Sequence, residues 1–258
     1  MQPMIQAQDI AGRVAVITGA GRGIGRAFAE TLAAQGASVV IADRDAALAD
    51  ECAAAIRDSG GAAMAVATDI ADSASVLAMR SAVMMEHGRV DILVNNAALM
   101  SALERRPFWD IPPEEFDRVM QVNTGGTFRV SALLAPVMRA QGWGRIINMS
   151  SSTVLVGHPN YLHYVGSKAA LQGMTRSMAR ELAGSGVTVN ALLPGQILTG
   201  DVNIGQTDEA IARVLARQIV PRSGQTGDLT GLLVWLASAA SDFTTGQSFV
   251  LDGGFALM

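Results

Sequence analysis

Lysine, tyrosine and cysteine are nearly absent from this chain of 258 residues. Lys168 is its only lysine among 19 basic residues, and Tyr161 and Tyr164 are its only tyrosines. A genome rich in G and C explains the excess of arginine, but it does not explain why one lysine remains beside both tyrosines. A single cysteine, Cys52, excludes an internal disulfide. Because Cys52 lies in an Ala-rich helical stretch, we interpret it as a buried thiol rather than a nucleophile.

Charge is scarce as well: charged residues make up 16% of the chain, and the net charge is −4. Nucleic-acid binders usually carry a basic face, so we expect no nucleic-acid partner. The N-terminus has neither the basic start nor the apolar run of a signal peptide. The longest uncharged stretches, 146–167 and 182–200, are interrupted by polar or helix-breaking residues and are not plausible membrane spans. The sequence therefore predicts a cytoplasmic protein that does not contact a membrane.

Half of the residues are hydrophobic, and short β-branched runs alternate with longer amphipathic stretches. We expect strands at 14–18, 38–42, 63–67, 90–94, 145–149, 187–192 and 247–251. We expect helices at 28–35, 46–59, 73–87, 114–140, 161–183, 207–217 and 228–240. Short apolar strands that alternate with helices are typical of a parallel sheet buried on both faces. The pattern predicts a single α/β domain over 1–258, a doubly wound Rossmann fold with three α/β/α layers. Residues 194–227 are its expected substrate lid.

A glycine-rich loop follows the first expected strand and opens the first helix. It reads Thr18-Gly19-Ala20-Gly21-Arg22-Gly23-Ile24-Gly25. Glycines let the backbone approach a pyrophosphate, and a helix N-terminus favours its negative charge. Asp43 follows Gly23 by about 20 residues, the spacing of a carboxylate that binds the adenosine ribose and repels a 2′-phosphate. We therefore expect NAD rather than NADP, although Arg22 and Arg44 could each meet a phosphate.

Two further turns at strand ends are expected to contact the cofactor. Asp69 and Ile70 follow the third strand and are placed to cover the adenine. Asn95 and Ala97 belong to the run Asn95-Asn96-Ala97-Ala98 after the fourth strand. Asparagine in such a turn either satisfies backbone groups or contacts the cofactor, and the sequence leaves both interpretations open.

Tyr164 and Lys168 are four residues apart, which places them on one face of the same helix. A phenol with a pKa near 10 is a poor base at neutral pH, but a nearby cation favours the phenolate. That combination suits removal of a proton from an alcohol or its return to a carbonyl. An ammonium is compact, whereas a guanidinium is broad and planar, so arginine would be a poor substitute. The alternative is an ordinary surface pair on a helix. Such a pair is expected in a protein rich in lysine, and it is less expected in a chain with a single lysine.

Together these motifs resemble the short-chain dehydrogenase/reductase family, over nearly the whole chain. The resemblance rests on Thr18–Gly25, Asn95–Ala98, Ser151, Tyr164, Lys168, Pro194-Gly195 and the final Asp252-Gly253-Gly254. It implies that Ser151, 13 residues before Tyr164, holds the substrate oxygen, with Ser150 and Ser152 as competing choices. It implies that Asn123 supports a proton-relay water, and that Pro194, Gly195, Ile197 and Thr199 lie at the nicotinamide end. It also implies a homodimer or homotetramer.

Two branches of the same superfamily need separating from this interpretation. Tyr161 lies seven residues before Lys168, a spacing seen in enoyl reductases. Those enzymes lack this glycine loop and typically lack a tyrosine at the position of Tyr164, so we interpret Tyr161 as a pocket wall or as a packing residue. The sugar-nucleotide epimerases have a different glycine spacing and longer chains, so this branch is disfavoured as well.

The expected reaction is reversible hydride transfer between a secondary alcohol, aromatic alcohols included, and NAD. The pocket candidates are mostly apolar or neutral: Leu99, Thr153, Leu155, His158, Tyr161 and Gln196. We expect no arginine cluster for an anionic substrate, because Arg105 and Arg106 are interpreted as surface residues. The alternatives are a sugar or polyol dehydrogenase, a 3-oxoacyl-carrier reductase, or a non-catalytic NAD-binding sensor. The three histidines lack the spacing of metal ligands, so no metal is expected.

Overall fold

The computed structural model describes residues 10–200 and 207–257. Seven strands form one parallel sheet in the order β3-β2-β1-β4-β5-β6-β9. Their bounds are β1 Val14–Thr18, β2 Ser38–Asp43, β3 Ala62–Ala67, β4 Ile92–Asn95, β5 Gly144–Met149, β6 Val187–Pro194 and β9 Ser248–Leu251. The helices are α1 Gly23–Ala34, α2 Ala46–Asp58, α3 Ser73–His87, α4 Pro113–Val119, α5 Thr127–Gln141, α6 Thr153–Val156, α7 Leu162–Glu181, α8 Asp208–Leu215 and α9 Gly227–Ala237.

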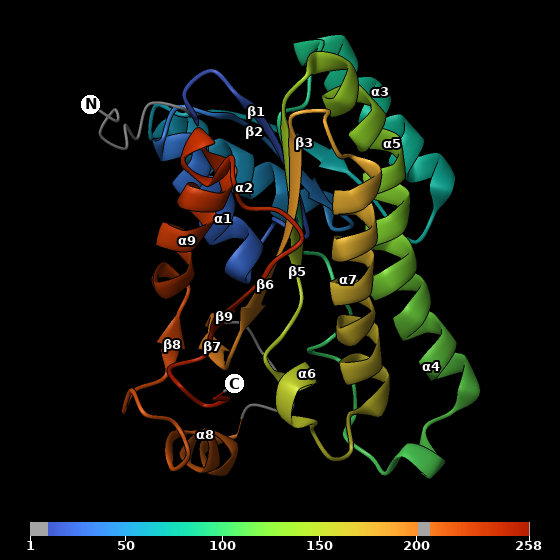
Figure 1. Ribbon diagram of the computed structural model, residues 1–258, viewed down its shortest axis with the longest axis vertical. Helices are drawn as coiled ribbons and strands as arrows, with labels where there is room; N and C mark the ends of the chain where they lie inside the picture. The colour runs from blue at the N-terminus through green and yellow to red at the C-terminus, as the bar shows by residue number, and fades with distance from the viewer. Residues whose placement is uncertain (1–9, 201–206, 258) are drawn as a thin grey trace.

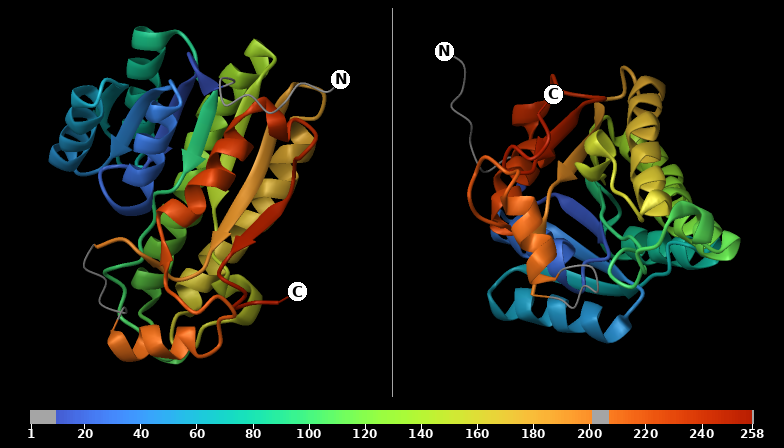
Figure 2. Two further views of the ribbon diagram at one scale, coloured as in Figure 1. Left: turned by 90° about the vertical axis from the view of Figure 1, so that its left-hand side faces the viewer. Right: turned by 90° about the horizontal axis from the view of Figure 1, so that it is seen from below.

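Helices cover both faces of the sheet, as Figures 1 and 2 show. Successive residues of a strand point to opposite faces, so each strand feeds two cores. Ile17 of β1 packs with α1, α2 and α9, whereas its neighbour Val16 packs with α3 and α5. Cys52 is buried in the first of these cores, and burial raises the pKa of its thiol to about 11. The expected three-layer, doubly wound α/β fold is confirmed.

The order of the strands determines where a ligand can bind. The chain starts in the middle of the sheet at β1, moves outward through β2 to β3, and then crosses to β4 on the other side of β1. The connections that leave β1 and β4 therefore diverge onto opposite faces. The carboxyl ends of these strands open a crevice between them, which is the usual ligand position in such sheets.

Two predicted helices have different bounds in the structure. The first begins at Gly23, five residues before the expected start, because Arg22 takes the extended N-cap conformation and the last glycines of the loop are already helical. The long helix expected over 114–140 is interrupted between α4 and α5 by a π-helical segment, Met120–Gly126. Gly126 lies in this segment where Ile70 packs directly against it, which leaves no room for a side chain. Such bulges recur at functional sites.

The region expected as a lid, 194–227, has structure of its own. Ile197–Leu198 pairs in parallel with Gly224–Gln225 as the short strands β7 and β8. Helix α8 lies between them, and Thr207 caps it by accepting a hydrogen bond from the amide of Ala210. The six residues 201–206 of the predicted lid lie outside the described part of the chain. Within the described residues, no helix is both long and apolar enough to cross a membrane.

Candidate active site

A cavity of about 860 Å³ lies at the carboxyl ends of the strands. The glycine loop, the ends of β2 to β6, and helices α7 and α8 all contribute to it. Its walls include most residues predicted for the cofactor and the reaction: Gly19, Arg22, Gly23, Ile24, Asp43, Asp69, Ile70, Ala97, Ser151, Tyr164, Lys168, Pro194, Gly195, Ile197 and Thr199. The structure thus brings together residues that are up to 180 positions apart in sequence.

The glycine loop is held close to the end of β4. Gly19 has a left-handed φ of +63°, and a Cβ there would lie 2.8 Å from the Cα of Ala97. The side chain of Asn96 donates hydrogen bonds to the carbonyls of Thr18 and Gly19, at 3.0 and 2.9 Å. Gly25 does not line the cavity, but a side chain there would collide with the same loop. The loop leads directly into the N-terminus of α1, and it is a cradle that fits a pyrophosphate.

Asn95 was expected either to satisfy backbone groups or to contact the cofactor, and the structure places its side chain away from the cavity. Strand β4 continues through Asn95, which pairs in register with Asn148 of β5. Its side chain therefore points into the interior, where it donates to Ser131 Oγ at 2.9 Å and to Asn148 Oδ1 at 2.8 Å. The next residue, Asn96, lines the cavity instead. The sequence presented two adjacent asparagines, and only the register of the strand distinguishes their roles.

Asp43 ends β2 at the rim of the cavity. One carboxylate oxygen accepts a hydrogen bond from the amide of Gly21 at 2.9 Å, and the other accepts from the amide of Asp45 at 3.0 Å. These bonds fix the carboxylate beside the glycine loop. Two arginines, Arg22 and Arg44, line the same part of the cavity.

Tyr164, Lys168 and Ser151 form the centre of the predicted reaction site. All three are buried, with exposed fractions of 6%, 4% and 7%. The first two lie on α7, and Ser151 follows β5. The ammonium of Lys168 donates to the carbonyl of Met149 at 2.7 Å and lies 5.8 Å from the centroid of the Tyr164 ring. The loop after β5 thereby connects to the helix that carries the tyrosine.

Burial has the largest effect on the pKa values of Tyr164 and Lys168. It raises the pKa of Tyr164 to about 12, whereas a hydrogen bond with Ser151 acts in the opposite direction and lowers it. Burial also lowers the pKa of Lys168 to about 8. The sequence predicted that Lys168 would lower the pKa of the tyrosine. Among the described residues the contribution that lowers this pKa is that of Ser151, and an effect of Lys168 on the phenol in the cofactor complex stays a prediction.

Asn123 lies in the π-helical segment, is buried and does not line the cavity. Its amide oxygen accepts from the amide of Leu99 at 2.7 Å, and its amide nitrogen donates to Ser167 Oγ at 3.0 Å. Asn123 therefore connects the loop after β4 to helix α7, one residue before Lys168. The proton-relay role implied by the family resemblance stays a prediction.

Most of the predicted substrate residues do line the cavity: Leu99, Thr153, His158, Tyr161 and Gln196. Tyr161 stacks on Tyr164 with 4.7 Å between ring centroids, and its hydroxyl donates to the carbonyl of Met100 at 3.0 Å. Leu155 does not line the cavity. The short helix α6 turns Leu155 away and presents Thr153 and Val156 instead.

Several lining residues were missed from the sequence. Arg105 is exposed, as expected of a surface residue, but it also lines the cavity, whereas its neighbour Arg106 is paired with Glu104 and Glu115. Helix α8 and the turn after it contribute Ala210, Arg213, Val214 and Arg217, and the C-terminal segment contributes Phe255. The spacing of three, four and seven residues along α8 was the available signal, because it places those four on one helical face.

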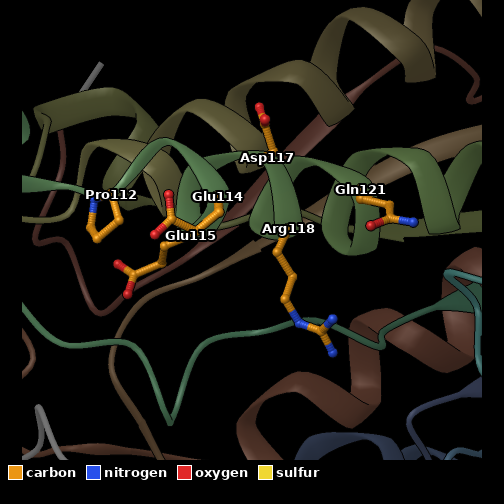
Figure 3. A pocket seen from close by; sticks show the side chains of 6 residues that line it. All are labelled: Pro112, Glu114, Glu115, Asp117, Arg118 and Gln121. Atoms are coloured by element: carbon orange, nitrogen blue, oxygen red, sulfur yellow. The ribbon is translucent and has the colours of Figure 1, made fainter.

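A second hollow, of about 670 Å³, lies over α4. It is lined by Pro112, Glu114, Glu115, Asp117, Arg118 and Gln121. In Figure 3 the side chains of Asp117 and Arg118 point to opposite sides of the helix rather than toward one point. We assign no chemistry to it. No group of three or more potential metal ligands occurs in the described residues.

Comparison with known proteins agrees with this geometry. A protein-family model described as enoyl-(acyl carrier protein) reductase matches residues 19–256. The galactitol 2-dehydrogenase of Agrobacterium fabrum is 39% identical over 258 residues, which cover 94% of this chain and 96% of that protein.

Two solved structures are similar over almost the entire chain. A 7α-hydroxysteroid dehydrogenase complexed with NADH and 7-oxo-glycochenodeoxycholic acid has a TM-score of 0.91 and 34% identity, and covers 97% of this chain and 98% of that one. A gluconate 5-dehydrogenase from Burkholderia cenocepacia, in complex with NADP and tartrate, has a TM-score of 0.90 and 36% identity, and covers 96% and 98%. The chain therefore belongs to the short-chain dehydrogenase/reductase family, NAD(P)-dependent enzymes that interconvert alcohols and carbonyl compounds.

Proposed function

We propose that this enzyme oxidises a secondary alcohol to its carbonyl compound, reversibly and with NAD as the preferred cofactor. The observation that carries the proposal is the convergence of buried Tyr164 and Ser151 on the wall of one cavity, with the buried Lys168 one turn along α7. A hydroxyl group that binds there meets one donor that holds its oxygen and one phenol that exchanges its proton.

The residues of the chain fit a nicotinamide dinucleotide. The close approach of Gly19 to Ala97 leaves a loop without side chains for the pyrophosphate, and Asp43 and Asp69 stand at the ends of β2 and β3 for the adenosine half. When bound, the nicotinamide accepts or supplies the hydride. Tyr164 exchanges the hydroxyl proton, and Ser151 holds the substrate oxygen as a preorganised donor. Lys168 is placed to hold ribose hydroxyls and to stabilise the phenolate.

The arrangement of the two tyrosines favours alcohol chemistry over enoyl reduction. Tyr164 shares its hydrogen bond with Ser151, whereas the hydroxyl of Tyr161 is engaged by the carbonyl of Met100. A polyol or sugar substrate, or a 3-oxoacyl carrier, remains the second candidate, supported by the galactitol 2-dehydrogenase relative. A non-catalytic NAD sensor is disfavoured because it would not need all three of Ser151, Tyr164 and Lys168.

The test is NAD reduction measured over panels of secondary alcohols, aromatic alcohols and polyols, with the reverse reaction run on the matching ketones. We expect turnover with at least one panel and a dependence on Tyr164. Tight NAD binding without turnover of any alcohol or ketone would favour the sensor and contradict the proposal.

The preference for NAD rests on the Asp43 carboxylate, and the same assay tests it. The two similar solved structures differ in their cofactor, because one holds NADH and the other NADP. We expect kcat/KM to be at least about tenfold higher with NAD than with NADP, and Asp43→Ala to shrink that ratio because it removes the charge that repels a 2′-phosphate. The exposed Asp50 of α2 provides the matched control, Asp50→Ala, which should leave the ratio unchanged. Activity with NADP alone would contradict this assignment.

Assembly and location complete the proposal. We propose a homotetramer or homodimer, supported by exposed apolar side chains such as Phe128 on α5, which is 58% exposed. We propose a cytoplasmic location, which suits a chain whose one cysteine is buried and unpaired.

A further inference from the structure

Charge is distributed unevenly around the cavity. The only carboxylates among the described lining residues are Asp43 and Asp69, at the ends of β2 and β3. The reaction centre lies beyond β5, three strands from β2 in the sheet order, or roughly 14 Å at the usual strand spacing. Among the described residues, the part of the cavity around Tyr164 therefore has no lining carboxylate, and the charged residues that line it there are basic.

Three of the basic lining residues belong to segments outside the central sheet, and all three are exposed. Arg213 of α8 and Arg217 in the turn that follows it are four residues apart and line the cavity together with Ala210 and Val214. The amide of Arg217 donates to the carbonyl of Val214 at 3.0 Å within that turn. The third is Arg105, whose guanidinium carbon lies 5.3 Å from the ring centroid of Tyr161.

Arg105 is the arginine whose distance from the reactive phenol can be followed through ring contacts. Tyr161 stacks in turn on Tyr164, so one aromatic ring separates the guanidinium from the reactive phenol. Arg217 lies over the ring of Phe255, another lining residue, at 4.7 Å from its centroid. Arg105 and Arg217, although exposed, thus each lie over an aromatic ring that lines the cavity.

None of the three arginines forms a salt bridge with a carboxylate of the described residues. Arg213 donates through Nε to the backbone carbonyl of Glu209, and its terminal nitrogens are not engaged there. In contrast, Arg222 makes two hydrogen bonds to Asp228, at 2.6 and 2.7 Å. Glu209, one helical turn before Arg213, interacts electrostatically with it, whereas Arg217 lies beyond the end of α8.

We propose that the substrate carries an anionic group, a carboxylate or a phosphate, remote from the reacting carbon, and that Arg213 and Arg217 bind it with Arg105 reinforcing the field. This rests on the proposed function and specifies its substrate class. Guanidinium groups match the planar geometry of carboxylate and phosphate oxygens. Basic groups that line a partly enclosed cavity also concentrate anions in it. The substrate is then a hydroxy acid or a phosphorylated alcohol rather than a neutral alcohol.

The experiment compares substrates that differ only in the remote group. The pairs are gluconate with sorbitol, sorbitol phosphate with sorbitol, and a hydroxyethyl-benzoate with its benzamide. Steady-state kinetics are measured on the wild-type enzyme and on Arg213→Gln/Arg217→Gln. Arg176→Gln is the matched control, since Arg176 is exposed on α7 and does not line the cavity. Binding of each compound to the NADH complex is measured in parallel by calorimetry.

We expect at least one anionic compound to have a KM and a Kd about tenfold lower than its neutral partner. The double variant should remove that advantage, while the Kd of NADH and the KM of the neutral partner stay within about twofold. Added salt should weaken the anionic compound selectively. The carboxylate and phosphate pairs distinguish the two anions.

Three outcomes would overturn the proposal, and each is distinct from failure of the proposed function. Equal binding of both members of every pair would show that no anionic group is recognised. Loss of NADH affinity in the double variant, without a change for the anionic compounds, would assign the arginines to the cofactor phosphates. An equal loss in Arg176→Gln would show a non-specific effect of net charge. If no compound is turned over, the proposed function fails, while calorimetry on the NADH complex still decides whether the anion is bound.

Discussion

Replacing Tyr164 by phenylalanine is expected to lower kcat by about a thousandfold or more while NAD binding changes less than about twofold. The variant keeps the ring that fills the site and removes only the hydroxyl that exchanges the proton. Positioned acid–base groups typically contribute a factor of about 10² to 10⁴ in rate. Because the ring of Tyr164 still stacks on Tyr161 at the same place in the core, the fold should be retained. Steady-state kinetics in both directions and the Kd of NAD measure the two effects separately.

The chain offers a matched control for this substitution in Tyr161→Phe. Tyr161 lies three residues earlier, stacks on the same ring, and uses its hydroxyl for a single hydrogen bond to Met100. Loss of such a bond costs on the order of 1 kcal/mol, so we expect at most about a tenfold decrease in kcat/KM. If instead Tyr161→Phe abolished turnover and Tyr164→Phe were active, the enoyl-reductase spacing would be the functional one and our assignment would be wrong.

Replacing Lys168 by arginine is expected to lower kcat at neutral pH by about a hundredfold, although the positive charge is conserved. The ammonium is buried and donates to the carbonyl of Met149 at 2.7 Å, a place that a broad, planar guanidinium cannot occupy without displacing the loop after β5. The arginine would hold its charge in a different position relative to the phenol. Since a nearby cation favours the phenolate, the pKa of Tyr164 in the cofactor complex should rise.

The pH dependence separates this explanation from simple unfolding. Alcohol oxidation uses the phenolate, so its rate increases as the pH rises toward the pKa of Tyr164, which burial raises to about 12 against the opposing effect of Ser151. We expect the rising, acidic limb of kcat/KM for oxidation to move to higher pH in Lys168→Arg, and higher pH to restore part of the rate. The control is Arg176→Lys, the reverse exchange at an exposed position two turns along α7, with thermal unfolding measured for both. Full activity at neutral pH would show that the single lysine is an accident of composition.

The fold and the reaction centre were predictable because they depend on local order in the chain. Short apolar strands that alternate with helices have few stable arrangements, and right-handed crossovers leave essentially a doubly wound sheet. The glycine loop lies between β1 and α1 where the sequence predicted it, although the helix begins earlier, at Gly23. The spacing of Tyr164 and Lys168 already fixed their common helical face.

Strand register decided what the sequence left ambiguous at Asn95 and Asn96. One extra residue in β4 moves a side chain from the cavity to the interior, because the side chains of a strand alternate between faces. No property of the asparagines themselves distinguishes the two. The same limit applies to Leu155, which the short helix α6 turns away from the cavity.

The sequence by itself determined the layers of the fold and the tyrosine–lysine pair through periodicity and short spacings, and its motifs resembled the family to which the chain belongs. Only the tertiary structure decided how the pKa values of Tyr164 and Lys168 shift and which charged side chains line the cavity. Burial depends on every element packed around Tyr164, so its raised pKa cannot be derived from neighbours in sequence. Arg105 and Arg217 are 112 positions apart, and the folding of the loop after β4 and helix α8 onto one cavity makes them neighbours of the same site.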